Sequence, residues 1–394
     1  MTDIETDNEA MGSSVVSNKI REFQVFVKPV SGRCNLRCRY CYYIGHGHQE
    51  GTCGGQRMSD EVLEAYIQQQ IHASGGREVF FSWHGGEPAL AGIDFYRRAV
   101  AIEKRYAPRD CIILNGIQTN ATLIDDAWGR FLREEGFYVG VSLDGPGRFH
   151  NNNRLRADGS GTFAEVMRGL EILRIHDVPH EVLCVVNSCS VNAPLEVYRF
   201  FRDLGVEFIT FLPLVERKNL SSPEVTERSV SAAGFGRFLS EVFDEWISND
   251  IGKIKVQVFE EALRTAFGQD HTLCIFKPVC GAVPVVEMNG DFYSCDHFVD
   301  EDHRSGNIMN RTLESLLDDP LQRAFGQAKK AALPRYCLDC EVLDMCNGEC
   351  PRNRFIKTPD GDPGLNYLCE GYKNFFNHCR PFINEVARLW KVRS

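Results

Sequence analysis

Three closely spaced cysteines, Cys34, Cys38 and Cys41, are the residues whose type and spacing most clearly indicate chemistry in this chain. They stand in the run CNLRCRYC, directly after an apolar segment with the composition of a β-strand. A C-x3-C-x2-C loop can place three thiolates around one [4Fe–4S] cluster, whereas such clusters are usually held by four cysteines. The fourth iron then has no protein ligand. The simpler alternatives are a zinc-binding loop or three buried thiols.

An iron without a protein ligand can bind a reactive molecule, and S-adenosylmethionine (SAM) suits this position. Its amino and carboxylate groups can chelate the iron and place the sulfonium beside an electron donor, which leads to radical chemistry. A second loop supports this interpretation, because His84, Gly85, Gly86 and Glu87 follow the next predicted strand. Paired glycines let the backbone approach a ligand closely, and we expect Glu87 either to receive the SAM ammonium group or to stabilise the loop. The alternative for HGGEP is an ordinary turn between a strand and a helix.

Four further residues are candidates for contacts with SAM or the substrate. Ser142, in VSLDGP, stands where its hydroxyl can reach a carboxylate, and Arg154 can pair with a carboxylate. Tyr40 and Tyr43 flank the last cysteine of the loop, so that one tyrosine can pack on adenine and another can line the substrate channel. Each of these residues is otherwise a capping, turn or packing residue, and the sequence favours ligand contact only for Ser142.

A second group of cysteines occupies the C-terminal third of the chain, and eight of them can hold two more clusters with four thiolates each. Clusters ligated in this way have no vacant iron, so we expect them to accept or relay an electron and to hold a loop-rich domain together. The competing interpretation is a pair of structural zinc sites, in which C-x2-C pairs are common. The eight residues are Cys274, Cys280, Cys295, Cys337, Cys340, Cys346, Cys350 and Cys369.

The elements that must position these residues follow a regular alternation. Short β-branched and aromatic runs alternate with helical patterns from about residue 22 to 217, which predicts βαβ units and a parallel sheet. Six units suggest an α/β fold with an open or partial barrel, in which ligands lie at the carboxyl ends of the strands. The cysteine loop and the motifs HGGEP, QTNAT and SLDG each follow a predicted strand, so we expect one ring of loops to face one cavity. The predicted strands are Phe23–Val30, Glu78–Trp83, Cys111–Gln118, Tyr138–Leu143, Glu181–Asn187 and Phe208–Val215.

The composition agrees with an intracellular metalloprotein. Sixteen cysteines in 394 residues without a secretory signal indicate metal ligation in a reducing cytoplasm rather than disulfides. The net charge of −10 argues against nucleic acid as the main partner, and no apolar run approaches the roughly 18 residues of a membrane span. We expect residues 1–20 to be a disordered lead-in, residues 21–250 a barrel, and residues 251–394 a cysteine-rich domain with a C-terminal helix.

At the level of motifs, the chain resembles the radical-SAM enzymes that carry a SPASM or twitch-type auxiliary-cluster domain. The resemblance rests on CNLRCRYCYY, HGGEPAL and VSLDGP, together with the array C-x9-G-x4-C … C-x2-C-x5-C-x3-C … C. Within that superfamily the chain is similar to the anaerobic sulfatase-maturating enzymes. The narrower evidence is YSCDHFVD at Tyr293–Asp300, the segment FLPLVER and the run NYLCEGYKNFF.

The resemblance implies a partial (β/α)6 barrel and the oxidation of a cysteine or serine, in a C/S-x-P-x-R motif of an unfolded sulfatase, to Cα-formylglycine. It implies three [4Fe–4S] clusters, SAM, and a flavodoxin or ferredoxin as electron donor. Asp296 falls where the family places its catalytic base, while His84 stands where some members carry glutamine. By the family pattern, one auxiliary cluster is held by Cys274, Cys280, Cys295 and Cys350, and the other by Cys337, Cys340, Cys346 and Cys369.

Two other functions compete with this interpretation. The first is a radical-SAM maturase that crosslinks or epimerises a ribosomally made peptide. Such enzymes often carry a peptide-recognition domain before the barrel, and about twenty polar residues precede the first predicted strand here. The second is a non-catalytic iron–sulfur electron carrier, which predicts no SAM cleavage and leaves HGGEP and SLDG unexplained.

Overall fold

The computed structural model describes residues 22–43, 57–75, 78–219 and 222–393, so the lead-in expected at residues 1–20 lies outside the described residues. Within this part of the chain, ten strands form one sheet in the order β10-β9-β8-β1-β2-β3-β4-β5-β6-β7. Each strand from β1 to β7 is parallel to the next, and β8 is parallel to β1. The last two strands, β9 and β10, are antiparallel. The first six strands and their helices form a partial (β/α)6 barrel, which confirms the predicted fold class.

The strands of the barrel lie close to their predicted positions. The first is shorter than the predicted Phe23–Val30, but the extended backbone continues on both sides of it, since Gln24 N and Lys28 N donate to Ala282 O and Val286 O. A seventh parallel strand, β7, was not predicted. The bounds are β1 Phe26–Val27, β2 Glu78–Trp83, β3 Ile112–Thr119, β4 Tyr138–Ser142, β5 His180–Val186, β6 Phe208–Pro213 and β7 Lys255–Val256.

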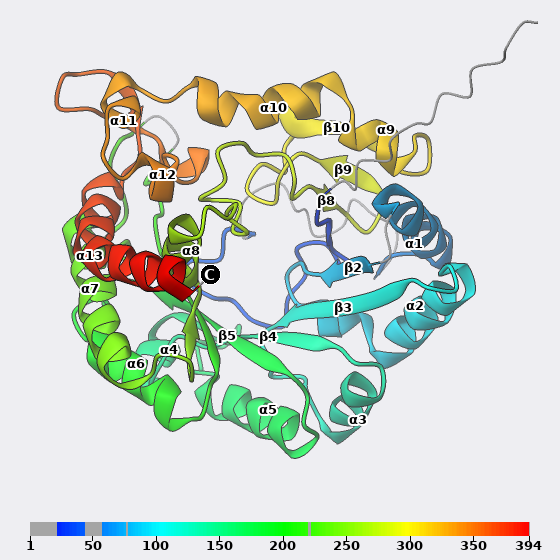
Figure 1. Ribbon diagram of the computed structural model, residues 1–394. Coiled ribbons are helices and arrows are strands. Elements are labelled where there is room, and N and C mark those ends of the chain that lie inside the picture. Colours follow the sequence, from blue (N-terminus) through cyan, green and yellow to red (C-terminus); the bar gives the residue numbers. More distant parts are fainter. Residues whose placement is uncertain (1–21, 44–56, 76–77, 220–221, 394) are drawn as a thin grey trace, which may run out of the picture.

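The helices of the barrel surround the sheet on its outer side (Figure 1). Two of them begin at side-chain caps, because Ser59 caps α1 by accepting from Val62 N, and Asp125 caps α3 by accepting from Trp128 N. The helices are α1 Asp60–Ser74, α2 Ile93–Tyr106, α3 Asp126–Glu134, α4 Gly147–Asn153, α5 Phe163–Ile175, α6 Pro194–Asp203 and α7 Ala232–Asn249.

The core between β2, β3 and α2 is aromatic. Trp83, at the end of β2, is fully buried and meets Phe95 and Tyr96 edge to face at 5.9 and 5.5 Å between ring centroids. Its indole Nε1 donates to Asn115 Oδ1 (2.8 Å), and Asn115 Nδ2 donates to Glu103 Oε2 (2.8 Å), so these buried polar groups are paired. This packing fixes the strand end from which the HGGEP loop leaves the sheet.

The residues after 250 extend the same sheet and cover its open side. The strands β8 Val285–Val286, β9 Asp291–Tyr293 and β10 Arg304–Asn307 continue it beyond β1, and α9 to α12 lie across the opening of the barrel (Figure 1). The long α13 packs against α7. None of the helices in the described part of the chain combines the length and apolar character that a membrane span needs. The remaining elements are α8 Gln257–Ala266, α9 Leu313–Leu317, α10 Pro320–Ala331, α11 Arg335–Leu338, α12 Leu343–Cys346, β11 Ile356–Lys357, β12 Pro363–Leu365 and α13 Cys369–Arg393.

A buried ion pair joins α8 to the cysteine-rich segment. His271 Nδ1 lies 2.8 Å from Glu261 Oε2, and His271 Nε2 donates to Asp344 O (2.9 Å). Both ring nitrogens therefore face acceptors, which favours the imidazolium form. Burial lowers the pKa of His271, but the Glu261 carboxylate and the Asp344 carbonyl outweigh burial, and the pKa is raised.

The substitution His271→Gln should therefore destabilise the protein in a pH-dependent way. A raised histidine pKa contributes stability that is complete below the ordinary value of 6.5 and is lost as the pH rises through the folded value. We expect a loss of about 1.5–3 kcal/mol near pH 6, typical of hydrogen bonds to charged groups, and a smaller loss near pH 9, measured by denaturant unfolding. His378→Gln is the control, because it removes an exposed pair with Asp244. Equal losses at the two pH values would contradict this role of His271.

Candidate functional site

The cysteine loop begins in close contact with the HGGEP loop. Gly86 N donates to Ser31 O (2.9 Å), and Glu87 N donates to Arg33 O (2.8 Å). A Cβ atom at Gly86 would lie 2.2 Å from Arg33 O, and one at Gly85, where φ is +117°, would lie 2.6 Å from Ser31 O. The paired glycines are therefore required for the packing of these two loops.

Glu87 lies at the centre of these loops and is fully buried. Its carboxylate accepts hydrogen bonds from Thr119 Oγ1 and Asn120 N, both at 2.7 Å, and from Ala89 N at 3.0 Å. Asn120 Nδ2 in turn donates to Cys34 Sγ (3.7 Å). The carboxylate thus ties the loops after β2 and β3 together next to the cysteine loop, which is what a loop-stabilising residue does.

The three thiols of the barrel lie together in this loop. Burial raises the pKa of Cys34 to about 12, with further contributions from Glu87, Cys38 and Cys41. Arg37 N and Arg39 N hold the loop by donating to the carbonyls of residues 155 and 153. Three thiols close enough to act on one another fit the ligand set of an iron–sulfur cluster, whose positive iron ions would favour the thiolate form.

Arg154 and Tyr40 meet at a carboxylate that the sequence analysis did not assign. Arg154 Nη2 lies 3.1 Å from Asp144 Oδ1, and Tyr40 Oη donates to Asp144 Oδ2 (2.5 Å). Burial works against the charge of Arg154, but Asp144, Tyr40 and Cys38 outweigh it and raise the pKa of the guanidinium. Arg154 thus pairs with a carboxylate, as expected, but with one of the protein's own, and it carries a fixed positive charge beside the cysteine loop.

Ser142 and His84 lie at the ends of their strands. Ser142 Oγ, at the end of β4, accepts from Gln118 Nε2 at 3.1 Å. His84 stacks on Phe26 at 3.8 Å between ring centroids, and its Nε2 lies 2.9 Å from Ser82 Oγ. Burial lowers the pKa of His84 to about 4, so its ring is neutral near pH 7.

Asp296 forms a second polar centre, which joins the two halves of the chain. Lys28 Nζ, fully buried at the end of β1, lies 2.7 Å from Asp296 Oδ1 and 3.0 Å from Glu287 Oε1. Tyr42 Oη and Tyr43 Oη both donate to Asp296 Oδ2, at 2.5 and 2.8 Å. The predicted base and the tyrosines that follow Cys41 are therefore in direct contact.

The electrostatics of this centre favour an ionised carboxylate. Burial raises the pKa of Asp296, but the charge and hydrogen bond of Lys28, with the hydroxyl of Tyr42, outweigh it and hold the pKa well below its usual range. Burial and the nearby Asp296 raise the pKa of Tyr42 and Tyr43, so both remain donors. The sequence analysis missed Lys28, although a lysine inside the apolar run QVFVKPV is a signal that could have indicated it.

The eight cysteines of the C-terminal part separate into two quartets, which we call the first and second quartets. Burial raises the pKa of six of these thiols, and in each case at least one thiol of the same quartet raises it further. The six are Cys274, Cys295, Cys350, Cys337, Cys346 and Cys369. The structure thus brings together the residues that the family pattern groups. The first quartet is Cys274, Cys280, Cys295 and Cys350, and the second is Cys337, Cys340, Cys346 and Cys369.

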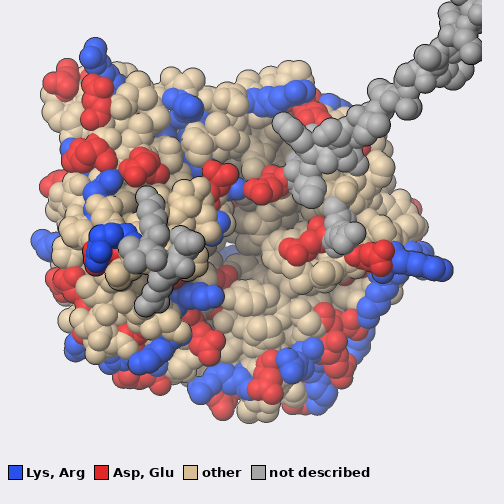
Figure 2. Space-filling model, viewed as in Figure 1, with Lys and Arg blue, Asp and Glu red and all other residues tan. Residues whose placement is uncertain are grey.

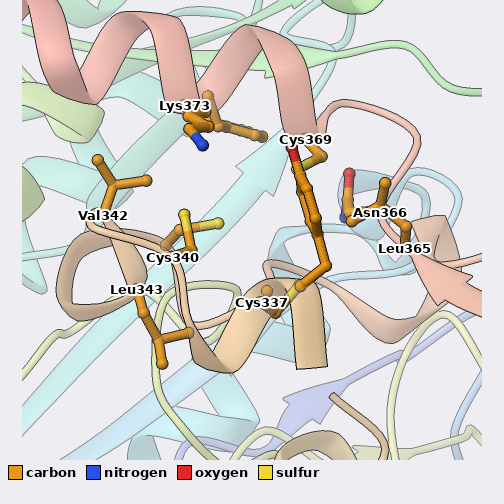
Figure 3. Close-up of a pocket in the computed structure, with 12 residues that line it drawn as sticks. Cys337, Cys340, Val342, Leu343, Leu365, Asn366, Cys369 and Lys373 are labelled. Atoms are coloured by element: carbon orange, nitrogen blue, oxygen red, sulfur yellow. The ribbon is translucent and has the colours of Figure 1, made fainter. Parts of the chain in front are cut away.

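A pocket of about 410 Å³, partly open to solvent, lies within the second quartet, and all four thiol residues line it. Figure 3 shows Cys337, Cys340 and Cys369 around this space, with Lys373 of α13 among the lining residues. Four cysteines that line one pocket fit the ligand set of a fully ligated iron–sulfur cluster.

The surface has a hollow on the face that is seen in Figure 1. Figure 2 shows that this face is hollowed at its centre, with acidic and basic side chains around the opening. Concave sites of this kind are where proteins commonly bind small molecules.

Comparison with known proteins identifies the relatives of this chain. Residues 29–191 match the model of the radical SAM superfamily, and residues 280–341 match that of an iron–sulfur cluster-binding domain. A serine-type anaerobic sulfatase-maturating enzyme of Bacteroides thetaiotaomicron is 41% identical over 92% of this chain and 91% of its own length. A cysteine-type enzyme of Clostridium perfringens is 32% identical over 92% of this chain and 98% of its own. The solved structure of native anSMEcpe with bound AdoMet and Cp18Cys peptide superposes with a TM-score of 0.82 at 32% identity, covering 93% of this chain and 99% of that one.

The contact between the glycine loop and the cysteine loop leads to a prediction. In Gly86→Ala, the added Cβ meets backbone rather than a movable side chain, so the cysteine loop must shift at a cost of about 1–3 kcal/mol. We expect faster amide hydrogen exchange in residues 31–41, measured by mass spectrometry. Gly252→Ala is the control, because its Cβ enters open space and the strain at its positive φ (+77°) falls in the turn between α7 and β7. Unchanged exchange in the loop of Gly86→Ala would show that the packing is not required.

Proposed function

The chain belongs to the anaerobic sulfatase-maturating enzymes, and from this we propose that it oxidises a cysteine or serine of an unfolded sulfatase to Cα-formylglycine by radical-SAM chemistry. The target residue lies in a C/S-x-P-x-R motif. The observation that carries the proposal is the placement of the three-thiol loop of Cys34, Cys38 and Cys41 beside an ionised Asp296 within a chain 41% identical to a sulfatase-maturating enzyme. A peptide maturase or an electron carrier has no comparable support.

We propose three [4Fe–4S] clusters, held by the barrel loop and by the two quartets. When bound, SAM and the clusters supply the hydrogen-abstracting 5′-deoxyadenosyl radical and an acceptor for the second electron. Gly85, Gly86, Ser142 and Arg154 are proposed to line the SAM site, with His84 and Tyr40 beside it. The first reduction is proposed to come from a flavodoxin or ferredoxin in the cytoplasm.

Asp296 is proposed as the general base. Its Oδ2 atom accepts hydrogen bonds from two tyrosine hydroxyls. A substrate thiol or hydroxyl that replaces one of these hydroxyls gains the same hydrogen bond. Lys28 keeps the other oxygen occupied and the carboxylate ionised. Once the β-hydrogen is lost, the adjacent O–H or S–H becomes more acidic, so a weak base is sufficient. Loss of this proton and one electron yields the aldehyde from serine. From cysteine it yields a thioaldehyde, which water converts to the aldehyde and hydrogen sulfide.

The function is tested with peptides that carry CxPxR or SxPxR. After anaerobic incubation of the reconstituted enzyme with SAM and a reductant, we expect a mass change to formylglycine and the formation of 5′-deoxyadenosine. The variant with Cys34, Cys38 and Cys41 replaced by alanine should lose about four of about twelve irons and should make neither product. If neither peptide is modified while SAM is still cleaved, the sulfatase assignment is wrong. The peptide that reacts also shows which residue type is accepted.

The role of Asp296 is tested by Asp296→Asn, which keeps size and shape but removes basicity. We expect the variant to retain its iron and to form 5′-deoxyadenosine, while formylglycine formation falls by about 10²–10⁴, the usual contribution of a general base. The measurement is the ratio of the two products by mass spectrometry. Asp300→Asn is the control, because Asp300 lies nearby in sequence with a more exposed side chain. Peptide turnover at the unaltered rate in Asp296→Asn would exclude Asp296 as the base.

A further inference from the structure

A buried lysine lies against the first quartet. Lys329, on α10, is 1% exposed, and its Nζ donates to the carbonyls of Cys274 (3.0 Å) and Ile275 (2.7 Å). Burial lowers the pKa of Lys329, and the thiols of Cys280, Cys274 and Cys350 oppose that shift, so three of the four thiols of the first quartet lie within its electrostatic reach.

A half-buried arginine, Arg354, lies within electrostatic reach of both quartets. The guanidinium of Arg354 donates to the carbonyls of Lys329 (2.5 Å), Gly348 (2.8 Å) and Asn347 (2.9 Å). Burial lowers its pKa, and the groups that oppose this shift include Cys337 and Cys346 of the second quartet and Cys280 of the first. Arg354 therefore reaches thiols of both quartets.

The backbone fixes the position of Arg354. Asn347, Gly348 and Glu349 all have positive φ values, of 46°, 70° and 52°, and the carbonyls of this turn accept from the guanidinium. A Cβ at Gly348 would lie 2.5 Å from Arg354 Nη2. A left-handed run of this kind is unusual for residues other than glycine. It persists because its carbonyls and the arginine hold each other in place.

These two cations lack matching negative charge. Each donates to carbonyls, and no ion pair with a carboxylate involves either of them in the part of the chain that the structure describes. The buried carboxylate of Glu349 is within electrostatic reach of both, but its oxygens accept from Asn366 and Asn353 instead. A buried charge such as that of Lys329 is normally paired or lies beside a metal site, so its missing counter-charge is expected from the thiolate-ligated clusters.

We propose that Lys329 and Arg354 are positioning residues that set the reduction potentials of the auxiliary clusters. This inference rests on the cluster assignment of the proposed function. Lys329 acts on the cluster of the first quartet, and Arg354 acts on both. A fixed cation favours the reduced, more negative form of a cluster and so raises its potential. The pair thereby makes it easier for the first cluster to accept one electron from the substrate and for the second cluster to take it onward.

The test uses the full chain with Cys34, Cys38 and Cys41 replaced by alanine, so that only the auxiliary clusters contribute to the signal. In this background, Lys329→Met is compared with Lys330→Met, which removes the same charge from the neighbouring, exposed position. Iron content and redox titrations followed by electron paramagnetic resonance are measured. Because a charge in a partly buried site acts through a low effective dielectric, we expect Lys329→Met to weaken one-electron reduction of the first cluster at least about tenfold, or about 59 mV. Lys330→Met should leave both potentials unchanged.

Arg354→Gln provides the second arm, and Arg354→Lys restores the charge. The glutamine variant should lower both potentials, and the lysine variant should recover most of that loss. Unchanged potentials in Lys329→Met and Arg354→Gln, with iron retained, overturn the inference, because a purely structural role affects stability and not the potential. If Lys329→Met loses iron, the inference is judged from the potentials of Arg354→Gln and Arg354→Lys. If the background protein itself holds no auxiliary iron, the cluster assignment is wrong, and the proposed function fails at that point instead.

Discussion

The buried contact between Lys28 and Asp296 joins the first strand of the barrel to the cysteine-rich segment more than 260 residues later. Removing two charges from water costs several kcal/mol for each ion, and an attraction across 2.7 Å offsets this cost only when further hydrogen bonds complete the geometry. Here Glu287 and two tyrosine hydroxyls complete it. The same strand pairing that brings Lys28 N to Val286 O also brings β8 and β9 beside the barrel. The position of the carboxylate proposed as the base therefore depends on the continuity of the sheet.

The loops around the thiols are organised on a similar basis. Glu87 receives three donors from two loops, and Asp144 receives Tyr40, Arg154 and the amide of Val185. Each buried carboxylate therefore ties together backbone segments from different strands. Such satisfied networks keep the loops rigid. The cysteine loop consequently has a defined position before any cofactor is considered.

Much of this arrangement could be predicted from the sequence. The alternation of strand and helix signals predicted six strands of the barrel, and the order of motifs along the chain predicted which loops meet at its carboxyl edge. The role of Glu87 was left open, because a glutamate in a glycine-rich loop suits a ligand and a loop network equally well. Asp144 and Lys28 were missed, since their partners lie at unrelated positions in the sequence. The first strand was predicted to be longer than β1 is. Gln24 and Lys28, on either side of β1, donate backbone hydrogen bonds toward β8, but the pairing with β2 covers only Phe26 and Val27.

The sheet also explains why the site cannot be assigned to one half of the chain. The division expected near residue 250 separates the barrel from the cysteine-rich segment in sequence, yet β7 and β8 to β10 flank the six barrel strands in one sheet. Asp296 lies beside Tyr42 and Tyr43, whereas Cys295, the residue before it, is within electrostatic reach of Cys274 and Cys280 of the first quartet. One turn of the chain therefore holds the proposed proton acceptor and a proposed cluster ligand as neighbours in sequence. This proximity suits the proposed reaction, because loss of the thiol or hydroxyl proton makes the adjacent carbon radical easier to oxidise.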